Sequence, residues 1–559
     1  MAGLFYGQRM HDLIRTPRVI PFFLLLISWL LPNHVPPFNT AYQDFSAVSA
    51  VLLLWILFPI SIRLDWRILI LVFFAFLPVF QWWLGTIFFW GDAFLASAYL
   101  LFFLFSLSFS SGLSDRKGLR EEFISRFFIF LILAAVLSIW IAARQWLLLS
   151  GSLWTADMPP GGRPFANMGQ PNNLATLLVM GLFGVVYFYE KHRFSHIIFW
   201  MLVLVLLFGV ALTQSRTPWL VFPVMLLYWV FKYRRDFRLT RFGFASMVGL
   251  YACMVVLLPT ISSTLLLSSA NPYERMQSLE RLDLWWQLLH AVLNGPLWGY
   301  GWNQVSVAQA HISQAYPVSL MTEHSHNILL DILLWNGPVV GSAVILFLGG
   351  WLFQVLRRSR SIESLCSVMA ASVVILHGML EYPLEYAFLL LPVGLLLGVA
   401  VSEDSVVKTI KVPSSFQYGI VCVLAMLLFW AWSEYRVVEE EHRLMRFETA
   451  KIGSVQSNHI APPVQLFTQL REFIRFVRTP AEPGMSEEDL IWMRKVAHRY
   501  PYPPSLFRYS LALGLNGHTD EAREQLSILR ALHGEEHYME ALQSIELMGK
   551  RYPQLQYIH

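Results

Sequence analysis

Long apolar runs alternate with short polar segments from the start of the chain to residue 433. Many runs approach the ~20 residues that an α-helix needs to cross ~30 Å of hydrocarbon. Backbone polar groups inside a bilayer must be hydrogen-bonded within the chain, so these runs are expected to be helices. The predicted spans are 19–32, 45–61, 68–85, 93–110, 127–149, 173–189, 196–212, 217–231, 243–262, 327–355, 364–382, 386–401 and 416–433. The predicted fold class is all-α, a polytopic helical membrane protein with about 13 transmembrane helices.

The composition supports this prediction. Hydrophobic residues make up 56% of the chain and charged residues only 14%, which excludes an ordinary soluble protein. The formal net charge of +4 comes from basic loops between the spans and gives no indication of nucleic-acid binding. The three cysteines all fall inside predicted spans, so no disulfide framework is expected.

Lys and Arg fill every second loop between the predicted spans. Cytoplasmic loops hold the excess of these residues in membrane proteins, so the N-terminus is predicted to be cytoplasmic. Thirteen spans then place the polar loop 263–326 and the tail 434–559 on the outside. The basic residues that break this alternation are Arg144, Arg163, Arg216, Arg275 and Arg281.

A polar segment from Ser263 to Asn336 ends in the sequence Glu323-His-Ser-His-Asn327, just where the next span begins. Imidazole titrates near neutral pH and can accept a proton from a hydroxyl group. His326 is therefore a candidate general base, placed where a lipid-borne substrate would present its head group. A helix-capping role and a metal site are the alternatives, although no Cys or further His nearby completes a ligand set.

Polar side chains also gather at the outer ends of several predicted spans. The loop 154–174 carries Arg163, Asn167 and Gln170, which suit sugar hydroxyls or phosphate but could instead hold the loop in place. An arginine at the membrane surface, such as Arg216, is costly unless it snorkels or pairs. Arg281 precedes Trp285 by four residues on a predicted helix.

His377 and Glu381 are four apart at the end of a predicted span, on one helical face. Ionisable residues at membrane depth usually face a bundle interior or a cavity. Whether this pair touches substrate or braces the helices is left open by the sequence.

After Ser433 the chain becomes charged, and from Ser486 it shows paired helical patterns. Small residues at the expected helix crossings and Gly517 at a turn are typical of a tetratricopeptide unit, although a generic helical hairpin is the alternative. The expected domains are a transmembrane core at 1–433, including the external loop, and a helical tail at 434–559. Removal of the tail is expected to spare the core.

Five motifs stand out between the apolar runs. They are Arg163-Pro-Phe-Ala-Asn-Met-Gly-Gln-Pro-Asn-Asn173, Gln214-Ser-Arg216, Gly299-Tyr-Gly-Trp302, His324-Ser-His-Asn327 and His377-Gly-Met-Leu-Glu-Tyr-Pro383. Together they resemble the O-antigen ligase superfamily, and within it the PglL-like bacterial O-linking protein oligosaccharyltransferases, or pilin glycosylation ligases. The resemblance departs at Asp331 and Trp335, where a more neutral segment is expected.

The resemblance implies an enzyme of the bacterial inner membrane with its site and its tail in the periplasm. It would transfer a glycan en bloc from an undecaprenyl-pyrophosphate carrier to a Ser or Thr hydroxyl of an exported protein such as a pilin, with no cofactor and no metal. His326 matches the essential histidine, and Arg216 and Arg281 match the two pyrophosphate-binding arginines. The other expected substrate contacts are Arg163, Asn167, Gln170, His324, Asn327, Glu381 and Tyr382.

Other functions are compatible with the same motifs. Ligation of O-antigen to a lipid core and polymerisation of repeat units on the carrier differ from protein glycosylation only in the acceptor. A transporter of lipid-linked glycan is a third possibility from a different class, and it would not require a base at the external face.

Overall fold

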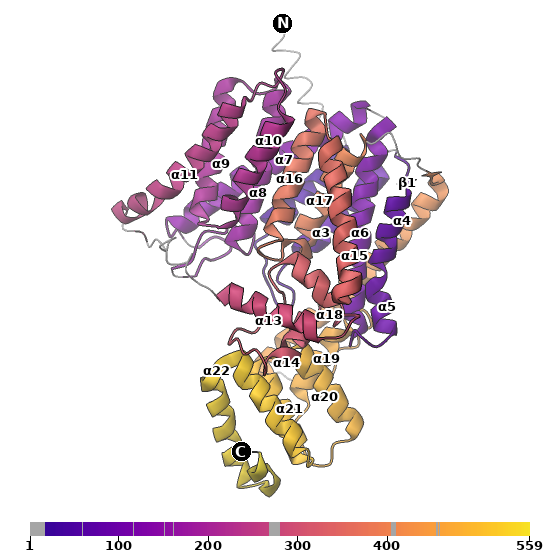
Figure 1. Cartoon of the computed structure of the whole chain (residues 1–559), viewed down its shortest axis with the longest axis vertical. Helices are drawn as coiled ribbons and strands as arrows, with labels where there is room; N and C mark the ends of the chain where they lie inside the picture. Colours follow the sequence, from indigo (N-terminus) through magenta and orange to yellow (C-terminus); the bar gives the residue numbers. More distant parts are fainter. Residues whose placement is uncertain are drawn as a thin grey trace. The chain divides into compact units, whose positions relative to one another are not determined.

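The computed structural model describes residues 17–58, 60–115, 117–149, 151–159, 161–265, 267, 280–403, 410–453, 457 and 459–558. Arg275 lies outside these residues. Nearly all regular structure in the described part is helical (Figure 1). The exception is a two-residue antiparallel pairing of β1 (Arg63–Leu64) with β2 (Ile410–Lys411), in which Arg63 faces Lys411. Short 3-10 helices occur at η1 (Pro17–Val19), η2 (Gly112–Asp115), η3 (Pro383–Glu385) and η4 (Pro553–Tyr557).

Every predicted span lies on an apolar helix. These helices are α2 (Ile20–Leu30), α3 (Ala41–Leu57), α4 (Trp66–Ala75) with α5 (Leu77–Trp83), α6 (Trp90–Ser111), α7 (Lys117–Trp146), α8 (Pro171–Glu190), α9 (His196–Leu212), α10 (Thr217–Lys232), α11 (Arg241–Thr264), α15 (Ile328–Arg358), α16 (Ile362–His377), α17 (Ala387–Val401) and α18 (Ser414–Thr449). Among the described residues, seven helical stretches are long and apolar enough to cross a membrane, and six more are shorter apolar helices. The prediction of an all-α, polytopic helical membrane protein is confirmed.

The chain divides into two compact units. Unit 1 comprises Met1–Val72, Tyr99–Gln277 and Gly350–Phe429, and unit 2 comprises Phe73–Ala98, Ser278–Gly349 and Trp430–His559. The end of the predicted external loop and the tail therefore belong to one unit. The domain boundary predicted after Ser433 falls inside α18, a single helix of 36 residues.

Unit 1 is a helical bundle in which α8 is almost entirely buried. Residues 173–189 of α8 are all buried, and the helix packs against α7, α9, α10 and α16. Gly181 permits the close approach of α7, because a Cβ at that position would lie 3.0 Å from the Cβ of Ala135. A helix that is apolar on all sides is expected to be buried in this way.

Unit 2 contains a break in α15 that the apolar pattern did not predict. The span predicted at 327–355 is a single run, but Gly337 has φ +74° and is followed by Pro338, so the helix changes direction there. The break receives the backbone of the Gly299-Tyr-Gly-Trp302 motif: Tyr300 N donates to Leu334 O over 2.8 Å. A Cβ on Gly299 would lie 2.4 Å from Gly337 N, so both positions require glycine.

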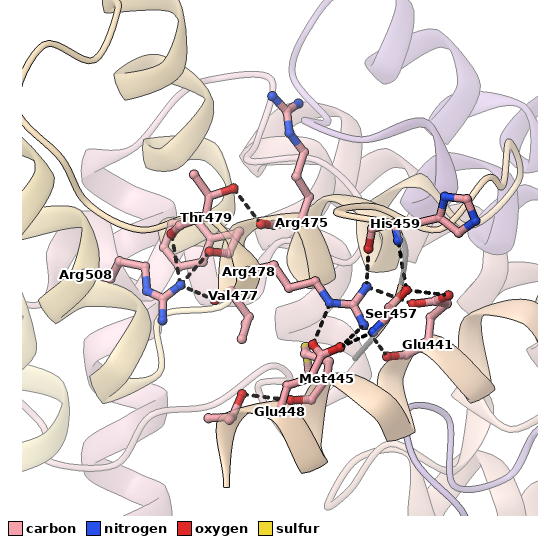
Figure 2. A network of polar contacts seen from close by, with 12 residues as sticks. Glu441, Met445, Glu448, Ser457, His459, Arg475, Val477, Arg478, Thr479 and Arg508 are labelled. Atoms are coloured by element: carbon pink, nitrogen blue, oxygen red, sulfur yellow. Dashed lines mark hydrogen bonds and ion pairs between the residues drawn. The ribbon is translucent and has the colours of Figure 1, made fainter. Parts of the chain in front are cut away.

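The tail continues from α18 into the helices α19 (Thr468–Arg478), α20 (Glu487–Arg499), α21 (Pro503–Leu515) and α22 (Thr519–Gly549), which Figure 1 shows in yellow tones. Helices α21 and α22 pack against each other as the paired pattern predicted. Arg478 joins the end of α18 to α19 through Glu441 and Glu448, each at 2.8 Å (Figure 2). Arg508 donates to the carbonyl groups that end α19, among them Phe476 O at 2.8 Å.

The core of the tail also includes residues from outside the tail. Phe89 and Ala310 belong to the same buried cluster as Met493, Leu506 and the other inward-facing residues of α20 to α22. Ala310 lies on α14 (Val305–Ile312). The tail and these segments thus share one hydrophobic core, which argues against the expectation that removal of the tail spares the core.

Candidate active site

The residues Thr322–Asn327, which we call the histidine loop, lead directly into α15. Asn327 caps this helix, because its Oδ1 accepts hydrogen bonds from Leu329 N at 3.0 Å and Leu330 N at 3.3 Å. His326 has φ +58°, a left-handed conformation that is uncommon for a residue other than glycine. Backbone held in such a region is often found at functional sites. Both His324 and His326 are partly exposed.

The carboxylate of Asp331 fixes the centre of the histidine loop. Asp331 is buried, and its Oδ1 accepts a hydrogen bond from Ser325 N at 2.8 Å. The hydroxyl of Ser325 donates to Asn327 O at 2.8 Å. The departure from the resemblance at Asp331 therefore has a structural role, since the carboxylate holds the turn that carries His326. Trp335, the other departure, stacks on Trp302 with ring centroids 4.4 Å apart.

Helix α13 (Glu280–Asn294) brings Arg281 to the same region of unit 2. Trp285 on this helix donates through its indole N–H to Ser325 O over 2.8 Å. Arg281 lies one turn before Trp285, so both Cβ atoms are on one face of α13, the face that contacts the histidine loop. The placement of Arg281 and Trp285 on one helix was predicted and is observed.

Two buried glutamine residues, Gln287 and Gln309, hold the start of the histidine loop in place. Gln309 Nε2 donates to Gln287 Oε1 at 2.9 Å, and Gln309 Oε1 accepts from Thr322 N at 2.9 Å. Gln287 in turn donates to Tyr316 O at 2.5 Å. Buried amides that are fully hydrogen-bonded make a rigid base for the loop above them.

Unit 1 brings three of the polar motifs together. Asn172 donates to Glu381 Oε1 at 3.0 Å and accepts from the Ser215 hydroxyl at 2.6 Å. Gln170 donates to the Tyr382 hydroxyl at 3.0 Å. The motifs at 163–173, 214–216 and 377–383 therefore form one polar cluster at the N-terminal ends of α8 and α10 and the C-terminal end of α16.

Arg163 and Arg216 lie at the edge of this cluster. Arg163 Nη1 donates to Gln214 O over 3.2 Å, and Gln214 has φ +48°. Arg216 is the N-cap residue of α10, and its side chain is exposed. An anion bound here would also face the N-terminus of α10, where the helix dipole is positive.

Asn167 is buried, and its amide is hydrogen-bonded to the backbone on all sides. Asn167 Nδ2 donates to Leu30 O at 2.7 Å and Trp154 O at 2.8 Å, and Oδ1 accepts from Ala156 N at 2.9 Å. These contacts match the alternative in which the amides hold the loop in place. We therefore assign Asn167 a positioning role in place of the substrate contact expected from the resemblance.

His377 and Glu381 each contact α8, and Glu381 N donates to His377 O at 3.0 Å in the turn that ends α16. Helix α16 ends at His377, so Glu381 lies beyond it. The His377 Nδ1 atom is 2.9 Å from the Thr176 hydroxyl, and Glu381 is bound by Asn172. The structure thus favours the bracing alternative for both side chains. Within the described chain, no group of three or more His, Cys, Asp or Glu side chains could hold a metal ion.

Comparison with known proteins gives two family matches. A model described as O-Antigen ligase matches residues 200–346, and a model described as Virulence factor membrane-bound polymerase, C-terminal, matches residues 367–544. The chain is 28% identical over 534 residues to a General O-oligosaccharyltransferase of Acinetobacter baylyi, covering 93% of each protein. It is 26% identical over 515 residues to a ComP-specific O-oligosaccharyltransferase of the same organism, covering 87% of this chain and 89% of that protein.

The chain thus contains a match to the O-antigen ligase family and is similar over nearly its whole length to two O-oligosaccharyltransferases. This agrees with the resemblance based on the five motifs.

The residues that the sequence analysis missed are those that hold the motifs in place, namely Gln145, Gln287 and Gln309. Gln145 Oε1 accepts from Phe165 N at 3.0 Å and Ala166 N at 2.8 Å. A glutamine inside an apolar helix was the available signal, because a buried amide requires several partners.

Proposed function

We propose that this protein is an O-linking oligosaccharyltransferase, which moves a glycan en bloc from a lipid-linked donor to a hydroxyl group of a protein. The observation that carries the proposal is similarity over nearly the whole chain, tail included, to two proteins named as O-oligosaccharyltransferases. The multi-pass helical core fits a donor that is anchored in the membrane.

We further propose undecaprenyl pyrophosphate as the carrier and an exported protein, such as a pilin, as the acceptor. The alternation of Lys and Arg between the spans supports a cytoplasmic N-terminus in the bacterial inner membrane. In that orientation the histidine loop and the tail face the periplasm, where exported proteins are found.

The side chains suit this reaction. A glycosyl pyrophosphate already carries a good leaving group, so the enzyme has to neutralise its charge and remove a proton from the acceptor. The guanidinium groups of Arg216 and Arg281 can bind phosphate oxygens in a bidentate manner without a metal. His326 can accept the hydroxyl proton as the oxygen attacks the anomeric carbon. A single displacement of this kind inverts that carbon.

Other residues of the motifs would orient the substrates. Arg163, Gln170 and Tyr382 are partly exposed and are proposed to contact the glycan or the pyrophosphate. His324 is proposed to contact the acceptor. Asn327 and Glu381 are engaged in capping and bracing bonds, so they are proposed to set the shape of the site.

The proposal is tested by incubating the purified protein with lipid-linked glycan and three acceptors: a folded exported protein, a Ser-containing peptide and lipid A core. Mass spectrometry of the products identifies the acceptor used. Glycan on the protein or on the peptide is the expected result. Glycan on the lipid core, or longer glycan on the carrier, would assign the protein to lipid ligation or polymerisation instead. Movement of the donor across vesicles without transfer would indicate a transporter.

Replacing either Arg216 or Arg281 with lysine is expected to impair both transfer and donor binding, although the charge is kept. The reason is that a lysine ammonium group cannot form the bidentate contact that a guanidinium group makes with phosphate. A loss of about 1–3 kcal/mol in binding is expected for such a charge-assisted contact. Binding of labelled donor and initial transfer rates measure the effect.

Arg144 provides the matched control for these two arginines. It also breaks the positive-inside alternation, but its guanidinium lies over the Trp140 ring at 5.2 Å from the centroid. Arg144→Lys should leave transfer unchanged. Normal donor binding and turnover in both Arg216→Lys and Arg281→Lys would contradict the pyrophosphate assignment.

A further inference from the structure

A buried ionic cluster in unit 2 connects the tail to the start of the histidine loop. Arg499, the last residue of α20, binds Asp92 at the start of α6 through two bonds, Nη2–Oδ1 at 2.9 Å and Nε–Oδ2 at 3.2 Å. Only 2% of the Asp92 side chain is exposed. The backbone carbonyl of Arg499 accepts the Ser306 hydroxyl of α14 at 2.7 Å. Arg499 therefore joins three segments that are far apart in the sequence.

Glu323 of the histidine loop belongs to the same cluster. Its Oε1 accepts the Tyr502 hydroxyl at 2.6 Å, and its Oε2 lies 3.7 Å from Arg499 Nη1. Burial, and then the neighbouring Glu323 carboxylate, raise the pKa of Tyr502. The hydroxyl therefore keeps its proton and donates a hydrogen bond to Glu323. One guanidinium thus faces two carboxylates, and the tail supplies both partners of Glu323.

The histidine loop has no regular secondary structure, so its shape depends on side-chain bonds at intervals along it. Thr322 is held by Gln309, and Ser325 is held by Asp331 and Trp285. Glu323 lies between these two points, three residues before His326, and its bonds come from α20 and from the start of α21. A shift of the tail would therefore displace Glu323 and the backbone between the anchor points at Thr322 and Ser325, close to His326, while Asn327 stays bonded to α15.

We propose that Arg499 and Tyr502 are positioning residues, which hold Glu323 so that the histidine loop presents His326 in a reactive geometry. The tail then contributes to the chemical step with every acceptor, in addition to any role in binding a protein. The rate measurement rests on the proposed function. The effect of Glu323 and Tyr502 on the order of the histidine loop can be measured whether or not the protein transfers glycan.

The test uses the full-length protein with Glu323→Gln and Tyr502→Phe, two changes that keep the volume of the side chain. Each is expected to lower kcat for transfer to a short peptide by about 10- to 100-fold, because a misplacement of about 1 Å is enough for such a loss. The KM for the lipid-linked donor should stay unchanged. Hydrogen–deuterium exchange of the backbone at residues 320–330 should become faster in both variants.

Glu441→Gln is the matched control. Glu441 also pairs with a tail arginine, Arg478, at 2.8 Å, and its side chain is less exposed than that of Glu323, at 12% against 35%. Its network involves α18 and α19 and not the histidine loop (Figure 2). This variant should keep wild-type kcat and wild-type exchange at 320–330.

Three results would overturn the inference: a wild-type kcat in both Glu323→Gln and Tyr502→Phe, an equal loss of kcat in Glu441→Gln, or a loss confined to the folded protein acceptor. The last result would make the tail a docking surface only. If the wild-type protein transfers no glycan, the proposed function fails. In that case the exchange measurement still decides whether Glu323 and Tyr502 hold the loop.

Discussion

Replacing His326 with asparagine is expected to abolish glycan transfer while membrane insertion and donor binding persist. Asparagine tolerates the left-handed backbone that His326 adopts at φ +58°, so the change removes the imidazole without forcing the loop to rearrange. Loss of a general base typically costs about 10²–10⁴-fold in rate. Alanine is a poorer choice, because it would add backbone strain to the loss of the base.

The measurement compares transfer rates with binding of labelled donor in the same preparation. His324→Asn serves as the control within the motif and is expected to reduce the rate less. Near-normal transfer by His326→Asn would remove the general-base assignment. Loss of wild-type activity on addition of a chelator would instead favour the metal alternative for the two histidines.

Replacing Arg499 with methionine is expected to destabilise unit 2 strongly. Methionine fills much of the arginine volume, but it leaves the Asp92 carboxylate buried without its cation. Removing one partner of a buried ion pair typically costs about 3–5 kcal/mol. Thermal unfolding of the protein in detergent, followed by exposure of Trp residues, should show a lower transition temperature and lost transfer to every acceptor.

The matched control is Arg478→Met in the network of Figure 2. Its partners Glu441 and Glu448 are less deeply buried than Asp92, so water can solvate them and a smaller loss is expected. Truncation after Ser433 should be more damaging than Arg499→Met, because it also removes the side chains that cover Phe89 and Ala310. A truncated protein that folds and binds donor normally would contradict this account and would restore the expectation of an independent core.

The spans were predictable because a membrane leaves few choices: an apolar run of that length has to be a helix. The break at Gly337 was not, since Asn336-Gly-Pro338 interrupts an apolar run without ending it. The break accommodates the backbone of Gly299, 38 positions earlier in the chain. Chain separation hides such a contact from any local pattern.

For the candidate site too, the sequence predicted one part and not another. The residues proposed to carry the chemistry, such as His326 and Arg281, were visible because charged and titratable groups are rare among apolar runs. The bonds that place them were not visible. Asn167 was expected to bind substrate because an amide looks the same in the sequence whether it faces a ligand or a backbone carbonyl. Asp331 departs from the expected pattern in the sequence, and only the structure shows that its carboxylate accepts a hydrogen bond from Ser325 N.

The separation of 407 positions between Asp92 and Arg499 also has a consequence in time. At about 5–20 residues per second, synthesis reaches Arg499 ~20–80 s after Asp92 has been made. Until then α6 carries an acidic group that has not met its cation, and the histidine loop has no tail to hold Glu323. If the tail positions Glu323 as proposed, a nascent chain that already contains every helix of the membrane core is expected to transfer glycan only slowly. On this proposal, full activity is expected only after Tyr502 has been made and has bound Glu323.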